Sequence, residues 1–129
     1  MSRLRFPLLK ATYEWLLDEG FTPYFLINAD FPEAVVPREF VEDGEIVLDA
    51  SPDAVDDMFF DEDGISFSAG FDGGEFRVYF PIGAVIALYA EENEQGLFAT
   101  DDNSTLLVQE SREPLNAKPA RRGNLKLVK

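Results

Sequence analysis

The sequence predicts an α+β fold that is mainly β, with one helix at the N-terminal end and short strands after it. Two observations support this class. An apolar repeat with near-helical spacing occupies the first 20 residues, whereas from Thr22 onward apolar residues form short runs or alternate with polar ones. With 46% hydrophobic residues among 129, including 12 Phe, the chain can build the core of one compact domain.

Residues 7–19 are expected to form the helix. Pro7 suits the first helical turn, and Gly20 lies just beyond the expected end. The apolar side chains cover more of the helix circumference than one stripe would need, and they are Leu8, Leu9, Tyr13, Trp15, Leu16 and Leu17. We therefore expect a homodimer seam along this helix, with burial inside one monomer as the alternative.

The strands expected next are short, and they comprise residues 24–28, 38–41 and 45–49. The strand at residues 64–71 alternates, so that one face carries Ile65, Phe67, Ala69 and Phe71. Asp72-Gly73-Gly74 turns the chain, and residues 75–80 alternate in the same way. The two segments are therefore expected to pair as an antiparallel hairpin.

The second half of the chain begins with an expected helix at Pro81, in which Ile82, Val85, Ile86 and Tyr89 recur at helical intervals. A last strand is expected at residues 96–100. The periodicity then ends, so residues 103–120 are interpreted as a flexible, disordered linker, with a short strand at residues 106–108 as the alternative.

The charge of the chain is divided between a body and a tail. Residues 1–102 carry five Lys/Arg against 23 Asp/Glu, a balance of −18, whereas residues 103–129 carry six against two, a balance of +4. Residues 121–129 form a basic and apolar peptide, which we interpret as a docking segment, with a solvated terminus as the alternative. A body this acidic would repel phosphate, so nucleic-acid binding is disfavoured.

The residue types that are missing restrict the chemistry. The chain has no His and no Cys, which excludes His-dependent triads, cysteine nucleophiles and the common zinc sites, and no Gly-Lys-Ser/Thr phosphate loop occurs. Asp56 and Asp57 would point to opposite faces of a strand, so they are interpreted as solvated charges. We expect no cofactor, no metal and no membrane contact. Without a secretory leader or a membrane-length apolar run, a cytoplasmic location is expected.

Several stretches of the chain resemble the stringent starvation protein B (SspB) family. The matching stretches are Tyr13-Glu14-Trp15-Leu16-Leu17-Asp18 with Thr22-Pro23, Asp43-Gly44-Glu45-Ile46-Val47-Leu48, Phe67-Ser68-Ala69-Gly70-Phe71, the segment from Pro81 through Tyr89-Ala90 with Glu92-Asn93, and the tail Leu125-Lys126-Leu127-Val128-Lys129. The resemblance covers residues 7–100 without obvious gaps and resumes at the terminus.

The resemblance implies a small Sm-like β-barrel or sandwich that dimerises through its N-terminal helix. Members of this family are adaptors without catalytic activity that deliver substrates bearing the ssrA degradation tag to the ClpXP protease. Their terminal peptide docks on the N-terminal zinc-binding domain of ClpX. A dimeric peptide-binding scaffold unconnected with a protease is the alternative function, and a carboxylate acid–base enzyme is a third.

Carried onto this chain, the resemblance implies three sets of site residues. The tag-binding groove comprises Ala54, Val55, Phe67, Ser68, Ala69, Gly70 and Phe71; the dimer interface comprises Leu9, Tyr13, Trp15 and Leu16; and the ClpX-docking peptide comprises Arg122, Leu125, Lys126, Leu127, Val128 and Lys129. Ordinary core packing is the alternative for Phe67 and Phe71. Gly70 stands where family members can carry a cation, and Arg77 would compensate if its strand lay beside the groove.

Overall fold

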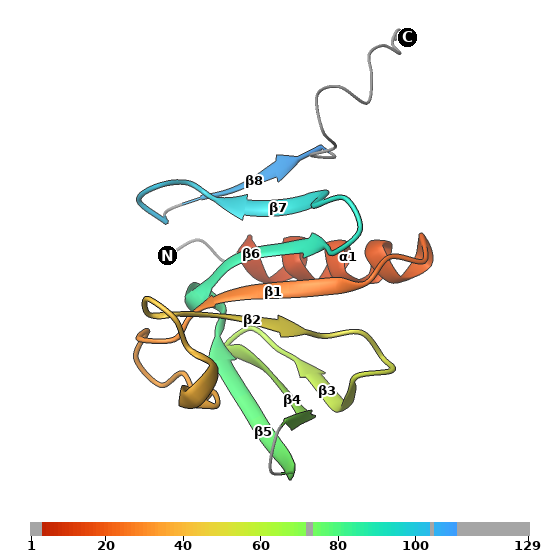
Figure 1. Cartoon of the computed structure of the whole chain (residues 1–129). Coiled ribbons are helices and arrows are strands. Elements are labelled where there is room, and N and C mark those ends of the chain that lie inside the picture. Colours follow the sequence, from red (N-terminus) through yellow and green to blue (C-terminus); the bar gives the residue numbers. More distant parts are fainter. Residues whose placement is uncertain (1–3, 72–73, 104, 111–129) are drawn as a thin grey trace, which may run out of the picture.

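The computed structural model describes residues 4–71, 74–103 and 105–110, and within these ranges it shows one α-helix and eight strands (Figure 1). The elements are α1 (Arg5–Asp18), β1 (Pro23–Asn28), η1 (Arg38–Phe40), β2 (Glu45–Asp49), β3 (Val55–Phe60), β4 (Gly64–Phe71), β5 (Gly74–Pro81), η2 (Ile82–Ala84), β6 (Val85–Ala90), β7 (Gly96–Ala99) and β8 (Leu106–Gln109). None of the helices in these ranges has the length and apolar character needed to cross a bilayer.

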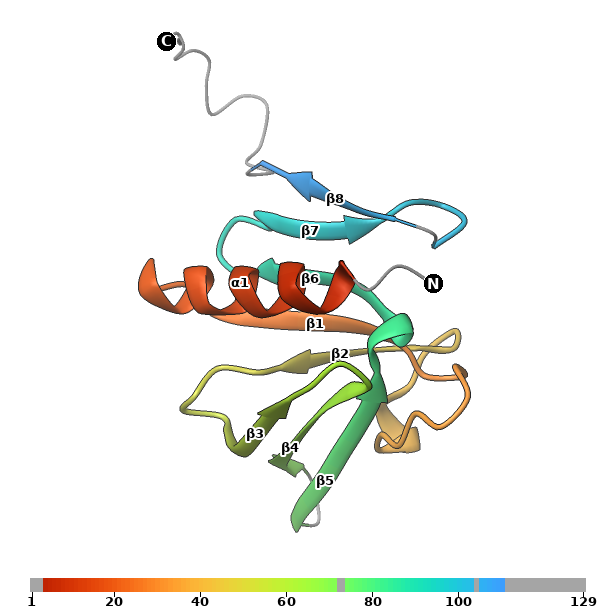
Figure 2. The same ribbon diagram turned by 180° about the vertical axis from the view of Figure 1, so that it is seen from behind.

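The strands form two antiparallel sheets, ordered β2-β1-β6-β7-β8 and β3-β4-β5. The predicted α+β, mainly β fold is confirmed. Within the described residues the sheets do not close into a barrel, so the sandwich is the form that the chain adopts. In Figure 2 the helix α1 crosses in front of the five-stranded sheet, and the three-stranded sheet lies below it.

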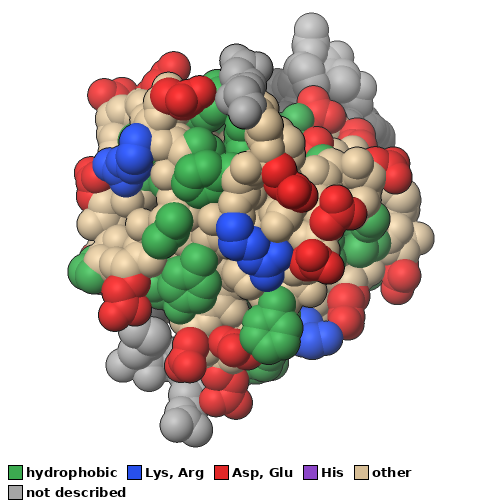
Figure 3. All heavy atoms as spheres, turned by 90° about the horizontal axis from the view of Figure 1, so that it is seen from below, with side chains coloured by type: hydrophobic (Ala, Val, Ile, Leu, Met, Phe, Trp, Pro, Cys, Tyr) green, Lys and Arg blue, Asp and Glu red, His purple; other side chains and the backbone are tan. Residues whose placement is uncertain are grey.

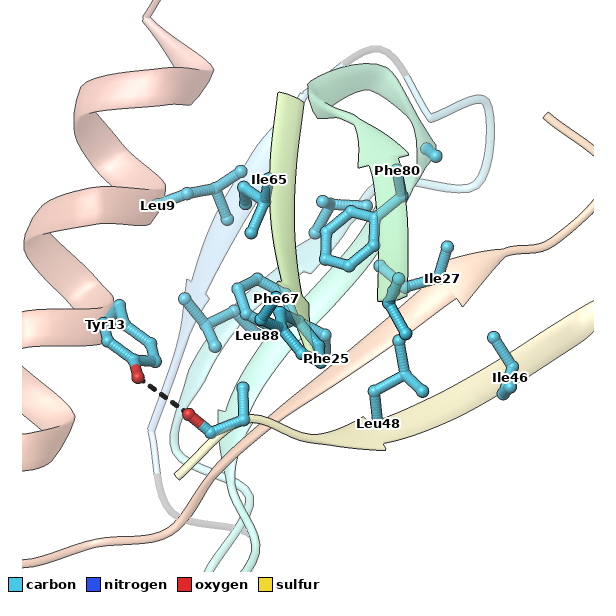
Figure 4. Close-up of a cluster of buried hydrophobic side chains, with 14 of the residues drawn as sticks. Leu9, Tyr13, Phe25, Ile27, Ile46, Leu48, Ile65, Phe67, Phe80 and Leu88 are labelled. Carbon is cyan, nitrogen blue, oxygen red and sulfur yellow. Dashed lines mark hydrogen bonds between the residues drawn. The ribbon is translucent and has the colours of Figure 1, made fainter. Parts of the chain in front are cut away.

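The core lies between the two sheets and the helix, and Phe25 of β1 is at its centre (Figure 4). The Phe25 ring lies 6.4 Å from that of Tyr13 on α1, and 5.3 Å from that of Phe80 on β5. The helix and the three-stranded sheet therefore pack on the same face of the five-stranded sheet. Burying aromatic rings of this size against one another contributes much of the hydrophobic free energy of folding.

The helix α1 begins two residues before the expected start, at Arg5, and ends one residue before the expected end. Arg5 is only 6% exposed, and its guanidinium donates hydrogen bonds to the carbonyl of Val85 at 3.0 Å and to the carbonyl and Oδ1 of Asn103 at 2.9 and 3.0 Å. Gly20 follows the helix at φ +82°, a conformation that favours glycine.

The expectation of a second helix beginning at Pro81 is wrong. Only the short 3₁₀ turn η2 is helical, and β6 then forms the central strand between β1 and β7. Val85 and Leu88 are buried in the core, and Ala87, on the other face of the sheet, is also buried between the larger side chains of Leu26 and Phe98. An apolar run of this kind has no clean alternation, so its spacing resembles that of a helix.

The strand expected at residues 38–41 is also wrong, because Arg38–Phe40 form the 3₁₀ helix η1. The guanidinium of Arg38 donates to the carbonyl of Ala29 at 2.7 Å and to Asp30 at 2.9 Å, which ties the segment back to the end of β1. These local side-chain bonds replace the strand pairing that the apolar residues suggested.

The remaining strands agree with the expected segments, with two additions. Strand β3 was not expected. Strand β8, residues 106–109, lies inside the stretch that was interpreted as a linker and pairs with β7, so the short strand left as the alternative is the conformation found. The sheet therefore continues about seven residues beyond the expected end of the body.

Candidate functional site

The seven residues expected to line the groove lie on two adjacent strands. Ala54 precedes β3 and Val55 begins it, while the other five follow one another along β4. Val55 pairs with Ala69 in the β3–β4 ladder, so the structure brings the two expected segments together.

Three of these residues point into the core. Val55, Phe67 and Ala69 are buried, and the Phe67 ring packs 6.2 Å from that of Phe80. For Phe67 this is the ordinary core packing that the sequence left open. The Phe67 ring packs on the core side of the sheet, so a peptide bound on the outer surface would not contact it.

Phe71 lies at the open end of β4 and is partly buried. Its ring lies 5.6 Å from that of Phe40 and 6.2 Å from that of Phe76. A hollow of about 270 Å³ adjoins it between the end of the three-stranded sheet and η1, and its lining is Pro37, Arg38, Glu39, Phe71, Gly74, Glu75 and Phe76. This hollow, called here the Phe71 hollow, has room for one apolar side chain of a ligand.

The outer face of the three-stranded sheet carries the small residues of β4 together with Arg77. Arg77 is opposite Ser68 in the β4–β5 ladder, and its guanidinium donates to the hydroxyls of Ser68 at 3.2 Å and Ser66 at 3.0 Å. An added Cβ at Gly70 would meet no atom within 4 Å. The strand of Arg77 therefore lies directly beside the expected groove residues, the condition under which it could compensate for Gly70.

Arg77 has no carboxylate partner, unlike the other exposed cations of the described residues. Lys10 pairs with Glu14 and Arg38 pairs with Asp30, both at 2.9 Å, while Arg5 is buried. Figure 3 shows the underside of the molecule, where basic and apolar side chains are surrounded by Asp and Glu. The Arg77 guanidinium can therefore donate hydrogen bonds to a ligand carboxylate without breaking an existing ion pair.

The outer edge of β5 presents unpaired backbone groups next to Arg77. Val35 forms an isolated bridge there: its N–H donates to the Tyr79 carbonyl at 2.7 Å, and the Tyr79 N–H donates to the Val35 carbonyl at 3.0 Å. Because backbone direction repeats every second residue, the N–H and C=O groups of Arg77 and Glu75 point to the same side. Among the described residues no strand pairs with this edge beyond Val35.

The surroundings of this edge are negative. Burial, and then the carboxylates of Glu33, Asp63 and Asp61, raise the pKa of the Tyr79 hydroxyl. The negative groups around Tyr79 thus oppose a further negative charge at this edge. Arg77 is consequently the group on this edge that attracts an anionic ligand.

In the part of the chain that the structure describes, no three carboxylates are grouped so that they could hold a metal ion. Asp56 and Asp57 are both exposed, and they lie at an irregularity of the β3–β4 ladder, where Asp57 has φ +55°. The position of this pair agrees with solvated charge.

The residues expected at a dimer interface are mostly inside the monomer. Leu9, Tyr13 and Leu16 are buried, and the Tyr13 hydroxyl donates a 2.7 Å hydrogen bond to the carbonyl of Ala50. For these three residues the structure shows the alternative, burial inside one monomer. Trp15, in contrast, is 40% exposed.

Sequence reasoning missed a second exposed apolar residue near Trp15. Val108 of β8 is 77% exposed. It borders a hollow of about 230 Å³ that is lined by Thr12, Trp15, Gln95, Gly96, Leu97, Val108 and Gln109. The signal was present in the run Leu106-Leu107-Val108, but three apolar residues did not distinguish a strand from a linker.

The expected docking peptide, Arg122, Leu125, Lys126, Leu127, Val128 and Lys129, lies outside the described residues. The last described strand before this peptide is β8, the edge strand of the five-stranded sheet.

Comparison with known proteins gives a consistent assignment. Residues 3–126 match the family described as stringent starvation protein B. A stringent starvation protein B homolog from Haemophilus influenzae is 43% identical over 90 residues, which cover 70% of this chain and 60% of the relative. The chain thus spans less than two thirds of the length of the curated relative it matches. By this match over nearly its whole length, the chain belongs to the stringent starvation protein B family.

Proposed function

We propose that the protein is a non-catalytic adaptor that binds the ssrA degradation tag and tethers tagged substrates to the ClpXP protease in the cytoplasm. The observation that carries the proposal is the open edge of β5 beside Arg77, a cation whose hydrogen-bond partners are the hydroxyls of Ser66 and Ser68. Family membership is the second support.

The tag is proposed to bind as an added strand along β5. Its backbone would pair with the outward N–H and C=O groups of Glu75 and Arg77, where the Val35 bridge ends. Successive side chains of an added strand point to opposite faces. An acidic residue of the tag would then meet Arg77 on the outer face, while an apolar neighbour enters the Phe71 hollow.

Delivery follows from tethering, since two sites on one chain raise the local concentration of substrate at the protease. Because β8 occupies residues 106–109, the proposed linker is shorter than the sequence suggested. Residues 110–120 would have a mean span of roughly 17–20 Å if they were a flexible coil. The tag site and the docking peptide, residues 121–129, would therefore work at close range.

A homodimer is proposed to form through the exposed surface of α1 and β8, with Trp15 and Val108 at its centre. A 40% exposed Trp and a 77% exposed Val beside one hollow make an apolar surface suited to a partner. Two tails in one assembly would add avidity for the protease.

The test measures the anisotropy of a fluorescent ssrA-tag peptide with the full chain, with Arg77→Ala and with Lys10→Ala. The two variants remove the same charge, but Lys10 lies on the helix α1, away from β5. We expect Arg77→Ala to weaken binding about tenfold, the loss of one charge-assisted contact of roughly 1.4 kcal/mol, and Lys10→Ala to have little effect. Equal affinity for all three proteins would reject the proposed site.

A degradation assay then separates the adaptor from a peptide-binding scaffold unconnected with a protease. Both the full chain and its residues 1–120 should bind the tag, but only the full chain should accelerate ClpXP degradation of a tagged reporter. Tag binding without acceleration by the full chain would favour the scaffold, which needs the β5 edge alone.

A further inference from the structure

One face of the five-stranded sheet is covered by neither the helix α1 nor the three-stranded sheet. The helix and the three-stranded sheet both contact Phe25, and they therefore lie on the inner face of β1. Tyr24 and Leu26 alternate with Phe25 and point the other way. In Figure 1 the sheet lies in front of α1, so this outer face is turned toward the viewer.

The strand register places apolar side chains in a row across all five strands of this outer face. Val47 pairs with Leu26, Leu26 with Ala87, Ala87 with Phe98 and Phe98 with Leu107. The rings of Tyr24 and Tyr89 lie beside this row. The Tyr89 ring is 6.0 Å from that of Tyr24 and 5.4 Å from that of Phe98. We define the outer apolar face as Tyr24, Leu26, Val47, Tyr89, Phe98 and Leu107. Its two ends are open, with Val47 49% and Leu107 55% exposed.

The rim of the outer apolar face is acidic. At the β2 side a hollow of about 420 Å³ is lined by Leu26, Phe40, Glu42, Asp43, Glu45, Ile46 and Val47, so three carboxylates surround apolar walls. At the opposite end of the strands, burial and then the charges of Glu91 and Asp49 raise the pKa of Tyr24. An occupant that is both apolar and cationic fits this arrangement.

The tail of the same chain has this chemistry. We propose that residues 121–129 dock on the outer apolar face. They contain two Arg and two Lys, no acidic residue, and the apolar side chains of Leu125, Leu127 and Val128. In an extended peptide Leu125 and Leu127 share one side, as the face requires, and the lysines reach the carboxylates of the rim.

The place where the described chain ends favours the same occupant. β8 is the edge strand next to Phe98, and the side chain of its last residue, Gln109, donates a 2.9 Å hydrogen bond to the carbonyl of Glu94. About 14 residues then precede Leu125, and a flexible chain of that length would span roughly 19–22 Å. Five strands are about 19 Å wide, so the tail reaches every part of the face.

A second copy of the chain fits this face less well. Residues 1–102 carry a balance of −18, and two outer faces brought together would oppose their acidic rims. Such like-charge contact disfavours association, whereas the tail brings the opposite charge.

The outer apolar face would compete with any partner of the tail, because a tail bound to this face cannot bind a partner at the same time. The proposal extends beyond the adaptor function and does not depend on it, since both surfaces belong to this chain. A failure of tag binding or of protease stimulation would leave it unchanged.

The test attaches a nitroxide spin label to Asn124→Cys in the full chain, which has no other Cys, and measures paramagnetic broadening of backbone amide signals. Position 124 preserves all four charges of the tail. We expect broadening in β1, β6 and β7 that disappears when the label is reduced. A lack of broadening in these three strands would overturn the proposal.

Adjacent residues of β8 provide the matched pair of variants. Leu107 and Val108 are both exposed but point to opposite faces of the sheet. Leu107→Asp should remove most of the broadening and Val108→Asp should leave it; the reverse would place the tail on the α1 side and contradict the proposal. Val47→Asp, at the far end of the row, should act like Leu107→Asp. Raising salt from about 0.1 M to about 1 M shortens the Debye length from roughly 10 to 3 Å and should also reduce the broadening.

Discussion

Arg77 lies directly opposite Ser68 in the β4–β5 ladder and donates a 3.2 Å hydrogen bond to its hydroxyl. A second bond to Ser66 holds the guanidinium over the neighbouring strand. These partners fix the position of the cation without neutralising it. In a protein with a net charge of −14, Arg77 is thus the exposed cation of the described residues that no carboxylate pairs with.

Gly70→Arg should strengthen binding of the ssrA tag. An added side chain at Gly70 meets no atom within 4 Å, and the position lies two residues beyond Ser68 on the same face of β4. A second cation there adds an exposed charge contact worth up to about 1 kcal/mol, so we expect roughly a two- to fivefold gain in affinity by anisotropy at low salt. Gly70→Gln, which is of similar polarity but uncharged, is the control. An equal gain with Gln would show that the charge is not the cause.

Arg5→Met should destabilise the fold by about 2–4 kcal/mol, measured by urea unfolding. The substitution retains much of the apolar stem but leaves the carbonyls of Val85 and Asn103 without their donor inside the protein. Lys10→Met is the matched control, since Lys10 is exposed and pairs only with Glu14 on the helix surface. Its effect should stay within about 0.5 kcal/mol, and equal effects of the two substitutions would contradict the anchoring role of Arg5.

The success of the sequence analysis depended on whether a strand has buried residues on one face or on both. The hairpin of β4 and β5 alternates because one face is core and the other is solvent, so both strands and the core positions of Phe67 and Val78 could be predicted. β6 is enclosed by neighbours on both edges and has buried residues on both faces, and its continuous apolar run was interpreted as a helix.

Of the candidate site, strand β4 could be predicted from the sequence, but the open edge of β5 could not. The alternation located β4, and the family resemblance implied that Gly70 stands where other members can carry a cation, but the pairing that places Arg77 beside Ser68 depends on the hairpin register. The open edge of β5 could not be inferred, because it is defined by Val35, more than 40 residues away in the chain. Burial of Tyr13 likewise depends on the distant carbonyl of Ala50.

Tyr13→Phe should cost about 1 kcal/mol of stability at neutral pH, measured by urea unfolding. The substitution removes the 2.7 Å bond to Ala50 and leaves that carbonyl without its donor, while the ring stays against Phe25. Tyr24→Phe on the outer face is the control and should change the free energy of unfolding by less. A stability of Tyr13→Phe equal to that of the parent protein would show that the bond adds nothing.

Stability should also fall at alkaline pH, and Tyr13 should account for part of the fall. Burial and the charge of Asp49 raise the pKa of Tyr13 above its ordinary value of 10.0. The folded state thus favours the neutral phenol, so the stabilisation is complete below about pH 10 and is lost as the pH rises through the folded pKa. Unfolding free energies measured from pH 8 to 11 should fall less steeply for Tyr13→Phe. The other tyrosines, whose pKa values are also raised, will retain part of the slope in both proteins.

Trp15→Glu should convert the proposed dimer to a monomer. Trp15 is 40% exposed beside Val108, and a carboxylate in that hollow would have to be desolvated on association with no described cation lining it. Sedimentation velocity measures the change, and Val35→Asp is the control, because Val35 is 50% exposed but lies against β5 on the other sheet. Dimers in both variants would move the interface away from α1. Loss of the dimer in Trp15→Glu alone, with tag binding per chain unchanged, would show that the two surfaces are independent.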